Sequence, residues 1–290
     1  MKDLFTKKWL TANSIQIVDQ YEKGILTIRG LHYRLVAAGM TNDIAHYKRV
    51  VDAIIDARWN GLIDFDTFSD HDRFMIGKTK NKIISLDESI NTAKVQVRAW
   101  ITNYNLNKWQ NQYYYPEVLI EKKALQGVFQ SVTDELDVSL GACKGYPSLT
   151  FLYDVAGRMT AAKGNGHFPI ILYFGDYDPS GEDIPRSIKE NIIKLGCPDI
   201  EVRRIALMKE QVIEMNLPPA PVKIADVRTA AWDGLGQVEL DAVEPNVLRD
   251  LCRKAVMDVF DEDSEDRLNE IEKTEGKIFR AELKKFVSTL

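Results

Sequence analysis

The N-terminal part of the chain carries apolar residues at helical spacing. Positions three or four residues apart predict three helices, over residues 11–24, over residues 28–38 after an N-cap at Thr27, and over residues 47–59. Gly24 and Gly39 are suited to end the first two helices, and Thr41 is a candidate cap for the third. The alternating residues 62–66 predict a short strand. Three helices followed by a strand are typical of a winged helix-turn-helix, which docks its last helix in the major groove of DNA.

From residue 113 onward, short apolar runs alternate with amphipathic segments. The apolar runs predict strands at residues 118–120, 138–140, 169–174, 202–207 and 238–241. Helices are expected between the first four, and again near the C-terminus over residues 245–258 and 264–287. This alternation predicts an α/β fold with a mostly parallel sheet. The expected organisation is a winged-helix domain (1–78), a helical connector (79–112), an α/β domain (113–260) and a C-terminal helix (261–290).

The strand at residues 169–174 runs directly into an acidic segment. We expect this strand to continue to Asp178, where a Pro-Ser-Gly turn follows. Residues two apart on a strand point to one face, so Asp176 and Asp178 would present their carboxylates together. Glu121 ends the strand at residues 118–120 and would lie at the same edge of a parallel sheet. Because neighbouring carboxylates are costly without a cation between them, these three residues predict a site for Mg²⁺ or Mn²⁺.

Composition narrows the class of protein. The 290 residues are 45% hydrophobic and 28% charged, which is typical of globular domains. No apolar run reaches the roughly 18–20 residues of a membrane helix, and no hydrophobic region follows the first residues, so neither a membrane span nor a signal peptide is expected. Cys143, Cys197 and Cys252 fit neither a zinc pattern nor a disulfide framework. A reducing, cytoplasmic location is the expectation.

Charge is distributed unevenly along the chain. The net charge is −5, but residues 1–120 carry 16 Lys and Arg against 13 Asp and Glu, and the remainder carries 22 against 30. A basic half joined to an acidic half is compatible with one DNA-binding domain and one metal-binding domain.

Two acidic segments resemble the motifs of a Toprim domain, which occurs in topoisomerases, primases and several nucleases. They are Val118-Leu119-Ile120-Glu121-Lys122 and Gly175-Asp176-Tyr177-Asp178-Pro179-Ser180-Gly181. The loop Cys143-Lys144-Gly145-Tyr146-Pro147-Ser148 resembles the loop after the second Toprim strand in the A subunit of topoisomerase VI, a family that includes the transesterase of meiotic recombination. The resemblance covers roughly residues 10–260. It implies a winged helix followed by a Toprim domain, a Rossmann-like fold.

The segment Thr27-Ile28-Arg29-Gly30-Leu31-His32-Tyr33 resembles the catalytic-tyrosine motif of the same family. The resemblance implies that Tyr33 attacks a DNA phosphate to form a 5′-phosphotyrosyl link, with Arg29 beside the phosphate and metal held by Glu121, Asp176 and Asp178. His32 departs from the motif, which has a paired aromatic residue there. The family pairs the tyrosine of one subunit with the metal site of the other, which implies a homodimer on double-stranded DNA. The chain has no glycine-rich ATP-binding motif, so a topoisomerase would need a separate ATPase subunit.

Further residues are candidates for DNA contact or for support of the metal site. Lys48, Arg49 and Arg58 on the third helix, with Lys144 in the loop, are the candidates for binding phosphates. The candidates for support are Glu239, Asp241 and Arg228. Lys122 and Lys123 are expected to be solvated at the start of a helix.

Three functions are compatible with these residues. The first is DNA cleavage by a tyrosine transesterase associated with the nucleoid. The second is hydrolytic cleavage by a metal-dependent nuclease, as in Toprim nucleases of plasmid and phage defence. The third is a DNA-binding subunit without catalysis. The substitution Tyr33→Phe separates the first two, because only the covalent enzyme requires the phenol.

Overall fold

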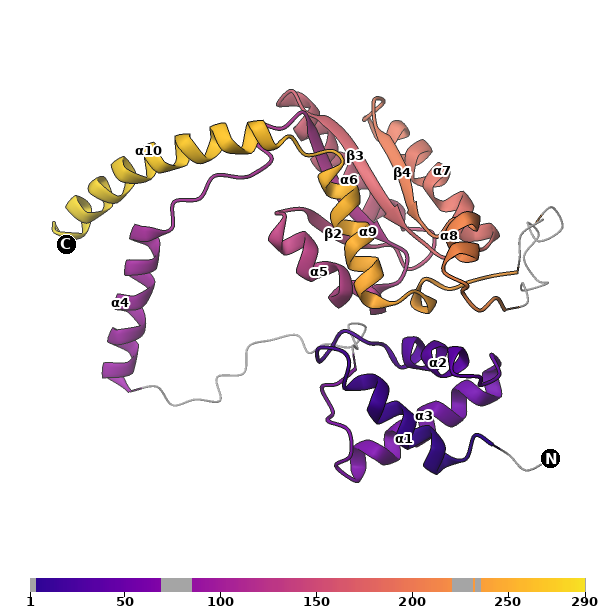
Figure 1. Cartoon of the computed structure of the whole chain (residues 1–290). Coiled ribbons are helices and arrows are strands. Elements are labelled where there is room, and N and C mark those ends of the chain that lie inside the picture. The colour runs from indigo at the N-terminus through magenta and orange to yellow at the C-terminus, as the bar shows by residue number, and fades with distance from the viewer. Residues whose placement is uncertain (1–3, 69–84, 221–231, 233–235, 290) are drawn as a thin grey trace. The chain divides into compact units, whose positions relative to one another are not determined.

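A computed structural model of the chain describes residues 4–68, 85–220, 232 and 236–289 (Figure 1). The chain divides into two units. Unit 1 contains the described residues up to 68 and the segment from 114 to 259, and unit 2 contains residues 85–113 and 260–289. In the part of the chain that is described, no helix is long and apolar enough to cross a membrane.

Unit 1 is built on a four-stranded parallel sheet in the order β2-β1-β3-β4. The strands are β1 (Tyr114–Ile120), β2 (Ser139–Ala142), β3 (Phe168–Phe174) and β4 (Glu201–Ala206). The central strands β1 and β3 are buried along most of their length, as expected when helices cover both faces of a parallel sheet. β3 is apolar throughout, whereas β1 contains the buried Glu117, whose carboxylate pairs with Arg158. The prediction of an α/β fold with a parallel sheet is confirmed.

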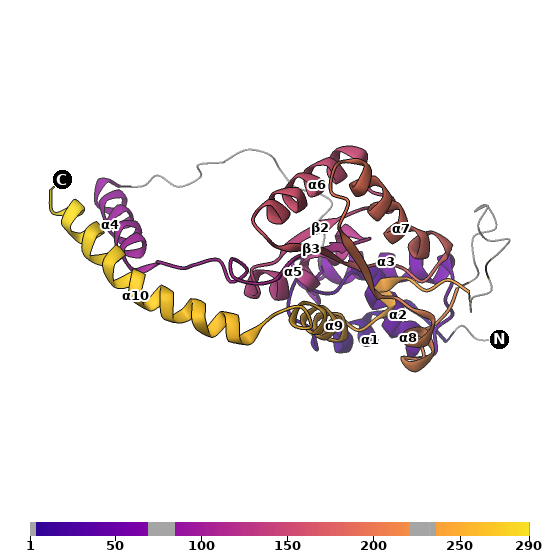
Figure 2. The ribbon, with the colours of Figure 1, turned by 90° about the horizontal axis from the view of Figure 1, so that it is seen from above.

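Helices lie on both faces of this sheet (Figure 2). The helical segments between and after the strands are η1 (Lys123–Leu125), α5 (Gln126–Glu135), α6 (Leu149–Gly164), α7 (Pro179–Lys194), α8 (Lys209–Glu214), η3 (Leu240–Ala242) and α9 (Pro245–Met257). On one face, apolar residues of α6 and α7 form a core with Leu119, Ile171 and Tyr173. On the other face, the ring of Phe129 in α5 packs edge-on against Phe174, and α9 packs against α5.

Three helices form the N-terminal part of unit 1: α1 (Lys7–Val18), α2 (Ile28–Ala37) and α3 (Ile44–Trp59). They share one apolar core. The side chain of Thr27 caps α2, as predicted from the sequence. The other two helices begin earlier than predicted, because Thr6 and Asp43 accept hydrogen bonds from the first turns of α1 and α3. Asp43, rather than Thr41, is therefore the cap of α3.

The strand expected at residues 62–66 is wrong. This segment forms turns, and strand-like pairing is limited to one parallel bridge between Leu26 and Phe68. The ammonium group of Lys23 binds Asp64 at 2.6 Å and Asp66 at 3.2 Å, which holds the turn together. The described residues therefore contain the three predicted helices, but no strand at the position predicted for a wing.

The described residues of unit 2 contain two helices, α4 (Leu86–Thr102) and α10 (Glu262–Val287). Within the described part of the expected connector, residues 85–112, the helix is α4, which begins at a capping box formed by Ser85 and Glu88. The segment after α4 is not helical and contacts α10: the Tyr104 hydroxyl bonds Glu275 at 2.5 Å, and its ring packs on Phe279.

Gly181 fixes the turn between β3 and α7. A Cβ at this position would lie 2.1 Å from the carbonyl oxygen of Asp176, which is backbone and cannot move aside easily. We expect Gly181→Ala to lower the free energy of unfolding by about 1–3 kcal/mol, as overpacking does elsewhere. The control is Gly157→Ala on α6, where a Cβ meets nothing within 4 Å; it should stabilise the helix by about 1 kcal/mol. Urea unfolding of both variants measures the difference, and equal effects would contradict the expectation.

Candidate metal and phosphate site

The carboxyl ends of β1 and β3 lie side by side at one edge of the sheet. The Glu121 amide donates to the Phe174 carbonyl at 2.8 Å, so residue 121 continues the pairing of the two strands. Its carboxylate accepts hydrogen bonds from the Asp176 amide at 2.9 Å and from the Tyr173 hydroxyl at 3.1 Å. Burial raises the pKa of Glu121, and the nearby Asp178 carboxylate raises it further. The two acidic segments of the sequence therefore meet at this edge.

Residues 176–178 are not part of a strand, which corrects the expectation of two aspartates on one strand face. β3 ends at Phe174. Asp178 instead caps α7, where its Oδ1 accepts a hydrogen bond from the Gly181 amide at 2.7 Å. The cause is the proline after Asp178, because proline favours the first position of a helix. The geometry of a helix start, rather than that of a strand, therefore positions the Asp178 carboxylate.

The ammonium group of Lys122 lies among three carboxylates. Its Nζ is 2.8 Å from Glu239, 3.0 Å from Asp241 and 3.2 Å from Asp176. Burial alone would lower the pKa of Lys122, but these three carboxylates raise it above its usual value. Lys122 is thus a largely buried cation at the centre of the site, which corrects the expectation that it is solvated.

The loop that carries Glu239 and Asp241 is not the strand expected at residues 238–241. Only Val238 pairs, in an antiparallel bridge with Tyr177, and the chain then turns into η3. The Leu240 amide donates to Asp176 Oδ1 at 2.7 Å, so a side-chain carboxylate accepts the hydrogen bond that a backbone carbonyl would accept in a sheet. This turn brings the carboxylates of residues 239 and 241 to Lys122.

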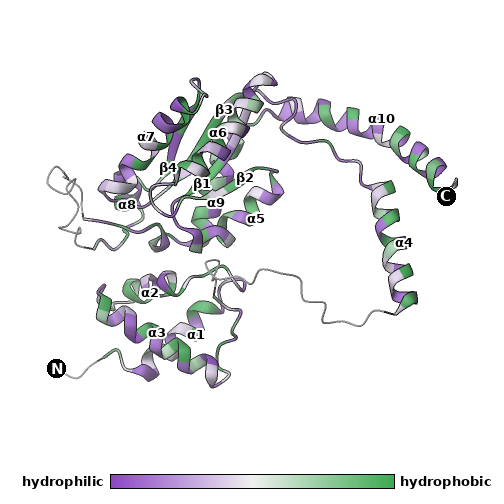
Figure 3. Cartoon of the chain, turned by 180° about the vertical axis from the view of Figure 1, so that it is seen from behind, coloured by the Kyte–Doolittle hydropathy of each residue, from purple (hydrophilic) through white to green (hydrophobic). Residues whose placement is uncertain are grey.

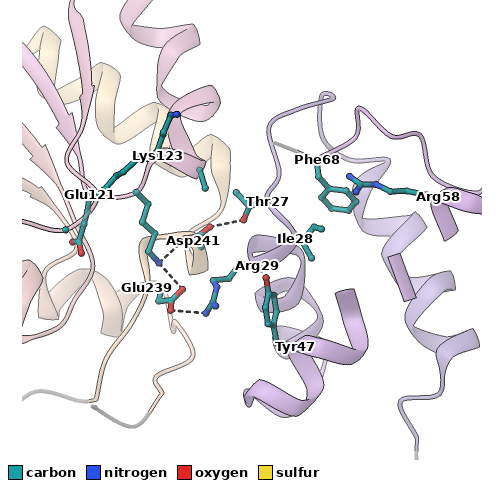
Figure 4. A pocket seen from close by; sticks show the side chains of 14 residues that line it. Thr27, Ile28, Arg29, Tyr47, Arg58, Phe68, Glu121, Lys123, Glu239 and Asp241 are labelled. Carbon is teal, nitrogen blue, oxygen red and sulfur yellow. Dashed lines mark hydrogen bonds and ion pairs between the residues drawn. The ribbon is translucent and has the colours of Figure 1, made fainter. Parts of the chain in front are cut away.

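The start of α2 contacts the same loop (Figure 4). The Thr27 hydroxyl donates to Asp241 Oδ1 at 2.8 Å, and the Arg29 guanidinium donates to Glu239 Oε1 at 3.0 Å. Arg34 donates to the carbonyl of the last residue of η3. Lys122 and Arg29 hold the pKa of Glu239 below its usual value, although burial opposes this effect. Side chains from both ends of unit 1 therefore complete the site.

Tyr33, the candidate nucleophile, is only 5% exposed. Burial raises its pKa, and the negative charge of Glu239 raises it further. Hydrogen bonds with Arg29 and Glu239 hold the phenol beside the acidic loop. In this arrangement the neutral phenol is favoured, so Tyr33 would have to lose its proton during attack on a phosphate.

A pocket of about 790 Å³ opens beside this cluster (Figure 4). Its lining combines cations, carboxylates and aromatic rings, and the side chains that give it this character are Arg29, Arg58, Lys122, Lys123, Lys144, Glu121, Glu239, Asp241, Tyr47 and Phe68. Five cationic groups in one pocket favour binding of a polyanion such as a nucleic-acid backbone. Tyr33 does not line the pocket.

The side chains fit a divalent cation in donor chemistry and in charge. The oxygen donors available are carboxylates, which suit Mg²⁺ and Mn²⁺. Five carboxylates lie in this region, those of Glu121, Asp176, Asp178, Glu239 and Asp241; Lys122 pairs with Asp176, Glu239 and Asp241, and Arg29 pairs with Glu239. Among the residues the structure describes, no three His, Cys, Asp or Glu side chains are grouped closely enough to hold a metal. Binding would therefore require these side chains to rearrange around the ammonium group.

The other expected DNA contacts lie at different places. Arg58 and Lys144 line the pocket, and the Arg58 guanidinium lies 5.1 Å from the centre of the Phe68 ring. Lys48 is exposed on α3 outside the pocket, and Arg49 donates to a carbonyl in the segment before α1. Arg228 lies outside the described residues.

The sequence interpretation missed several residues of the site. Lys122 and Lys123 were expected to be solvated, and Thr27 was expected only to cap α2. Tyr47 received no role, yet its ring lies 4.7 Å from the Arg29 guanidinium. One feature of the sequence could have indicated the site: Lys122 is a cation that directly follows an acidic residue at the end of a predicted strand.

Asp176 makes stability depend on pH. Burial is the main cause that raises its pKa to about 7, from 3.8 for an unperturbed aspartate; Lys122 opposes this rise, whereas Glu121 and Glu239 add to it. Because the folded state binds this proton more tightly, the contribution to stability is greatest below pH 4 and is lost as the pH rises through 7. We expect Asp176→Asn to be more stable than the wild type at pH 8, with an upper limit of about 4 kcal/mol, and this advantage should shrink below pH 7.

Urea unfolding at pH 5 and pH 8 measures this effect. The control is Asp154→Asn on α6, which removes a carboxylate from an exposed position and should change stability little at either pH. A loss of stability in Asp176→Asn at pH 8 would show that ion pairing outweighs the cost of burial.

No protein-family model, curated protein or solved structure matches the chain.

Proposed function

We propose that the chain cleaves DNA strands with the help of Mg²⁺ or Mn²⁺ at this site. The observation that carries the proposal is the cluster of carboxylates around Lys122, at the carboxyl edge of a parallel sheet and beside a pocket lined by cations. Parallel α/β sheets bind their ligands at this edge. Carboxylates for a metal next to cations for phosphate are the two parts that metal-assisted phosphodiester cleavage needs.

The resemblance to the A subunit of topoisomerase VI agrees with this proposal. In this view the α/β part of unit 1 is a Toprim domain, and the three N-terminal helices serve as a winged-helix domain that binds double-stranded DNA. Two features support it: the acidic segments after β1 and β3 meet in space, and α2 contacts them through Thr27 and Arg29. A homodimer is proposed with it, because the resemblance implies two subunits acting on two strands.

The proposed reaction assigns roles to residues of the pocket, to the neighbouring carboxylates and to Tyr33. Lys123, Lys144 and Arg58 bind the DNA backbone. Glu121, Asp176 and Asp178 would hold the metal, which when bound supplies positive charge to the phosphate. The Tyr33 oxygen bonds to phosphorus while the bond from phosphorus to the 3′ oxygen breaks. Glu239, which hydrogen-bonds the phenol, takes the Tyr33 proton, and the 3′ oxygen gains a proton from solvent to become a hydroxyl group.

Hydrolysis by water is the second candidate, and the burial of Tyr33 favours it. A phenol that is 5% exposed and outside the pocket lining must move before it can reach a phosphate. A water molecule in the pocket needs no such movement. In this reaction water bonds to phosphorus, and Tyr33 acts only through its hydrogen bonds to Arg29 and Glu239.

Supercoiled plasmid incubated with the protein and Mn²⁺, then stopped with detergent, separates the two reactions. Breaks that carry covalently bound protein until protease is added, and that disappear in Tyr33→Phe, are expected for the transesterase. The control Tyr153→Phe, on the exposed face of α6, should retain full activity. Protein-free breaks that persist in Tyr33→Phe would establish hydrolysis. Cleavage that is unaffected by Glu121→Gln would contradict metal-dependent cleavage at this site.

DNA binding in the pocket should depend on salt. We expect Lys144→Ala to weaken binding to duplex DNA similarly for all sequences and to reduce the slope of log K against log salt by about 1. The control is Lys189→Ala, an exposed lysine of α7 outside the pocket. Fluorescence anisotropy in EDTA measures binding without cleavage. Equal salt slopes for both variants would place the DNA elsewhere.

A further inference from the structure

The helix α10 has an acidic first half and a basic second half. Its acidic residues up to position 275 are Glu262, Asp263, Glu265, Asp266, Glu270, Glu272 and Glu275, against only Arg267 and Lys273. From position 276 onward its basic residues are Lys277, Arg280, Lys284 and Lys285, against only Glu282. The two halves therefore carry charges of opposite sign. This order agrees with the helix dipole, but seven carboxylates are far more than a cap requires.

One face of α10 is already in use within unit 2. Phe279 packs on Tyr104, and Glu272 accepts a hydrogen bond from the amide of Leu106. A Cβ on Gly276 would lie 3.7 Å from the Tyr104 ring, so this face lies close to the segment that follows α4.

A different face of α10 carries an exposed apolar stripe. Ile271, Ile278 and Ala281 lie on this face together with Thr274, whose hydroxyl donates to the Glu270 carbonyl at 3.0 Å; the four residues follow one another at spacings of three, four and three. This is the spacing by which paired helices bury a common seam. Ile271 is 40% exposed and Ile278 is 63% exposed, so the described residues leave this stripe largely uncovered. Figure 3 shows the hydrophobic residues of α10 interspersed among hydrophilic ones along the helix.

We propose that this stripe binds the same stripe of a second copy of the chain, with the two α10 helices antiparallel. The charge distribution along α10 favours an antiparallel orientation and a second copy of the same helix as the partner. A parallel pair would set acidic half against acidic half, whereas an antiparallel pair sets each acidic half against the basic half of the other copy. The stripe is compatible with this two-fold symmetry, because a centre near Gly276 places Thr274 opposite the partner's Ile278 and Ile271 opposite the partner's Ala281. Such an interface uses one surface on both copies and closes at a dimer.

Self-association through α10 does not require DNA cleavage. The stripe is narrow, and most of the complementary charges are exposed. Association should therefore weaken as added salt screens the charges.

Two charge-reversed variants of the full chain test the proposal. The acidic variant carries Lys277→Glu, Lys284→Glu and Lys285→Glu. The basic variant carries Glu265→Lys, Asp266→Lys and Glu270→Lys. In a homodimer of either variant, both halves of the two α10 helices would carry a net charge of the same sign, so each variant alone should be monomeric. An equimolar mixture pairs an acidic helix with a basic one and should form a heterodimer. Circular dichroism checks that each variant keeps its helices.

Sedimentation velocity at micromolar concentration and low salt is the measurement. We expect a wild-type dimer that dissociates in high salt, two monomeric variants, and a restored dimer when they are mixed. The double variant Ile271→Lys, Ile278→Lys should be monomeric in every combination. A monomeric wild type would overturn the proposal, because the stripe would then be covered by this chain itself or by a different partner. Dimers that persist in both variants, or a mixture that stays monomeric, would overturn it as well.

Discussion

The ion pairs of Lys122 hold the centre of unit 1 together. Its ammonium group joins Asp176 from the loop after β3 to Glu239 and Asp241 from the loop before α9. Without this cation, three carboxylates would face one another in a largely buried place, which is costly in free energy. The same group occupies the centre of the cluster that we propose binds a metal, so the site is neutralised in part by its own chain before any ion arrives.

The polar cluster also connects the N-terminal helices to the sheet. The contacts from α2 to the loop around η3 are hydrogen bonds and ion pairs, made by Thr27, Arg29 and Arg34. Changes in the charge of Glu239 or Asp241 would therefore affect both the carboxylate cluster around Lys122 and the position of α2. The buried phenol of Tyr33 shares this dependence, because it bonds to Arg29 and Glu239.

Periodicity in the sequence predicted the parallel sheet and most helices, because buried strands and amphipathic helices leave strong apolar patterns. It also placed Glu121 and Asp176 at one edge. Periodicity failed where single polar contacts determine the backbone conformation. The Asp178 side chain caps a helix, and the Leu240 amide donates its hydrogen bond to the Asp176 carboxylate rather than to a neighbouring strand. The role of Lys122 depends on Asp176 and Glu239, which lie more than 50 and more than 115 positions away along the chain. A pattern of neighbouring residues cannot predict such contacts.

The distance along the chain between Thr27 and Asp241 has a consequence for folding. These residues share a hydrogen bond although 214 positions separate them. Contacts between such distant residues form late, because closing a long loop costs entropy before the contact returns any free energy. During synthesis the three N-terminal helices can form their own core early. The contacts of α2 with Glu239 and Asp241 can form only after nearly the whole of unit 1 has been synthesised. The polar site is therefore assembled last, after the sheet it completes.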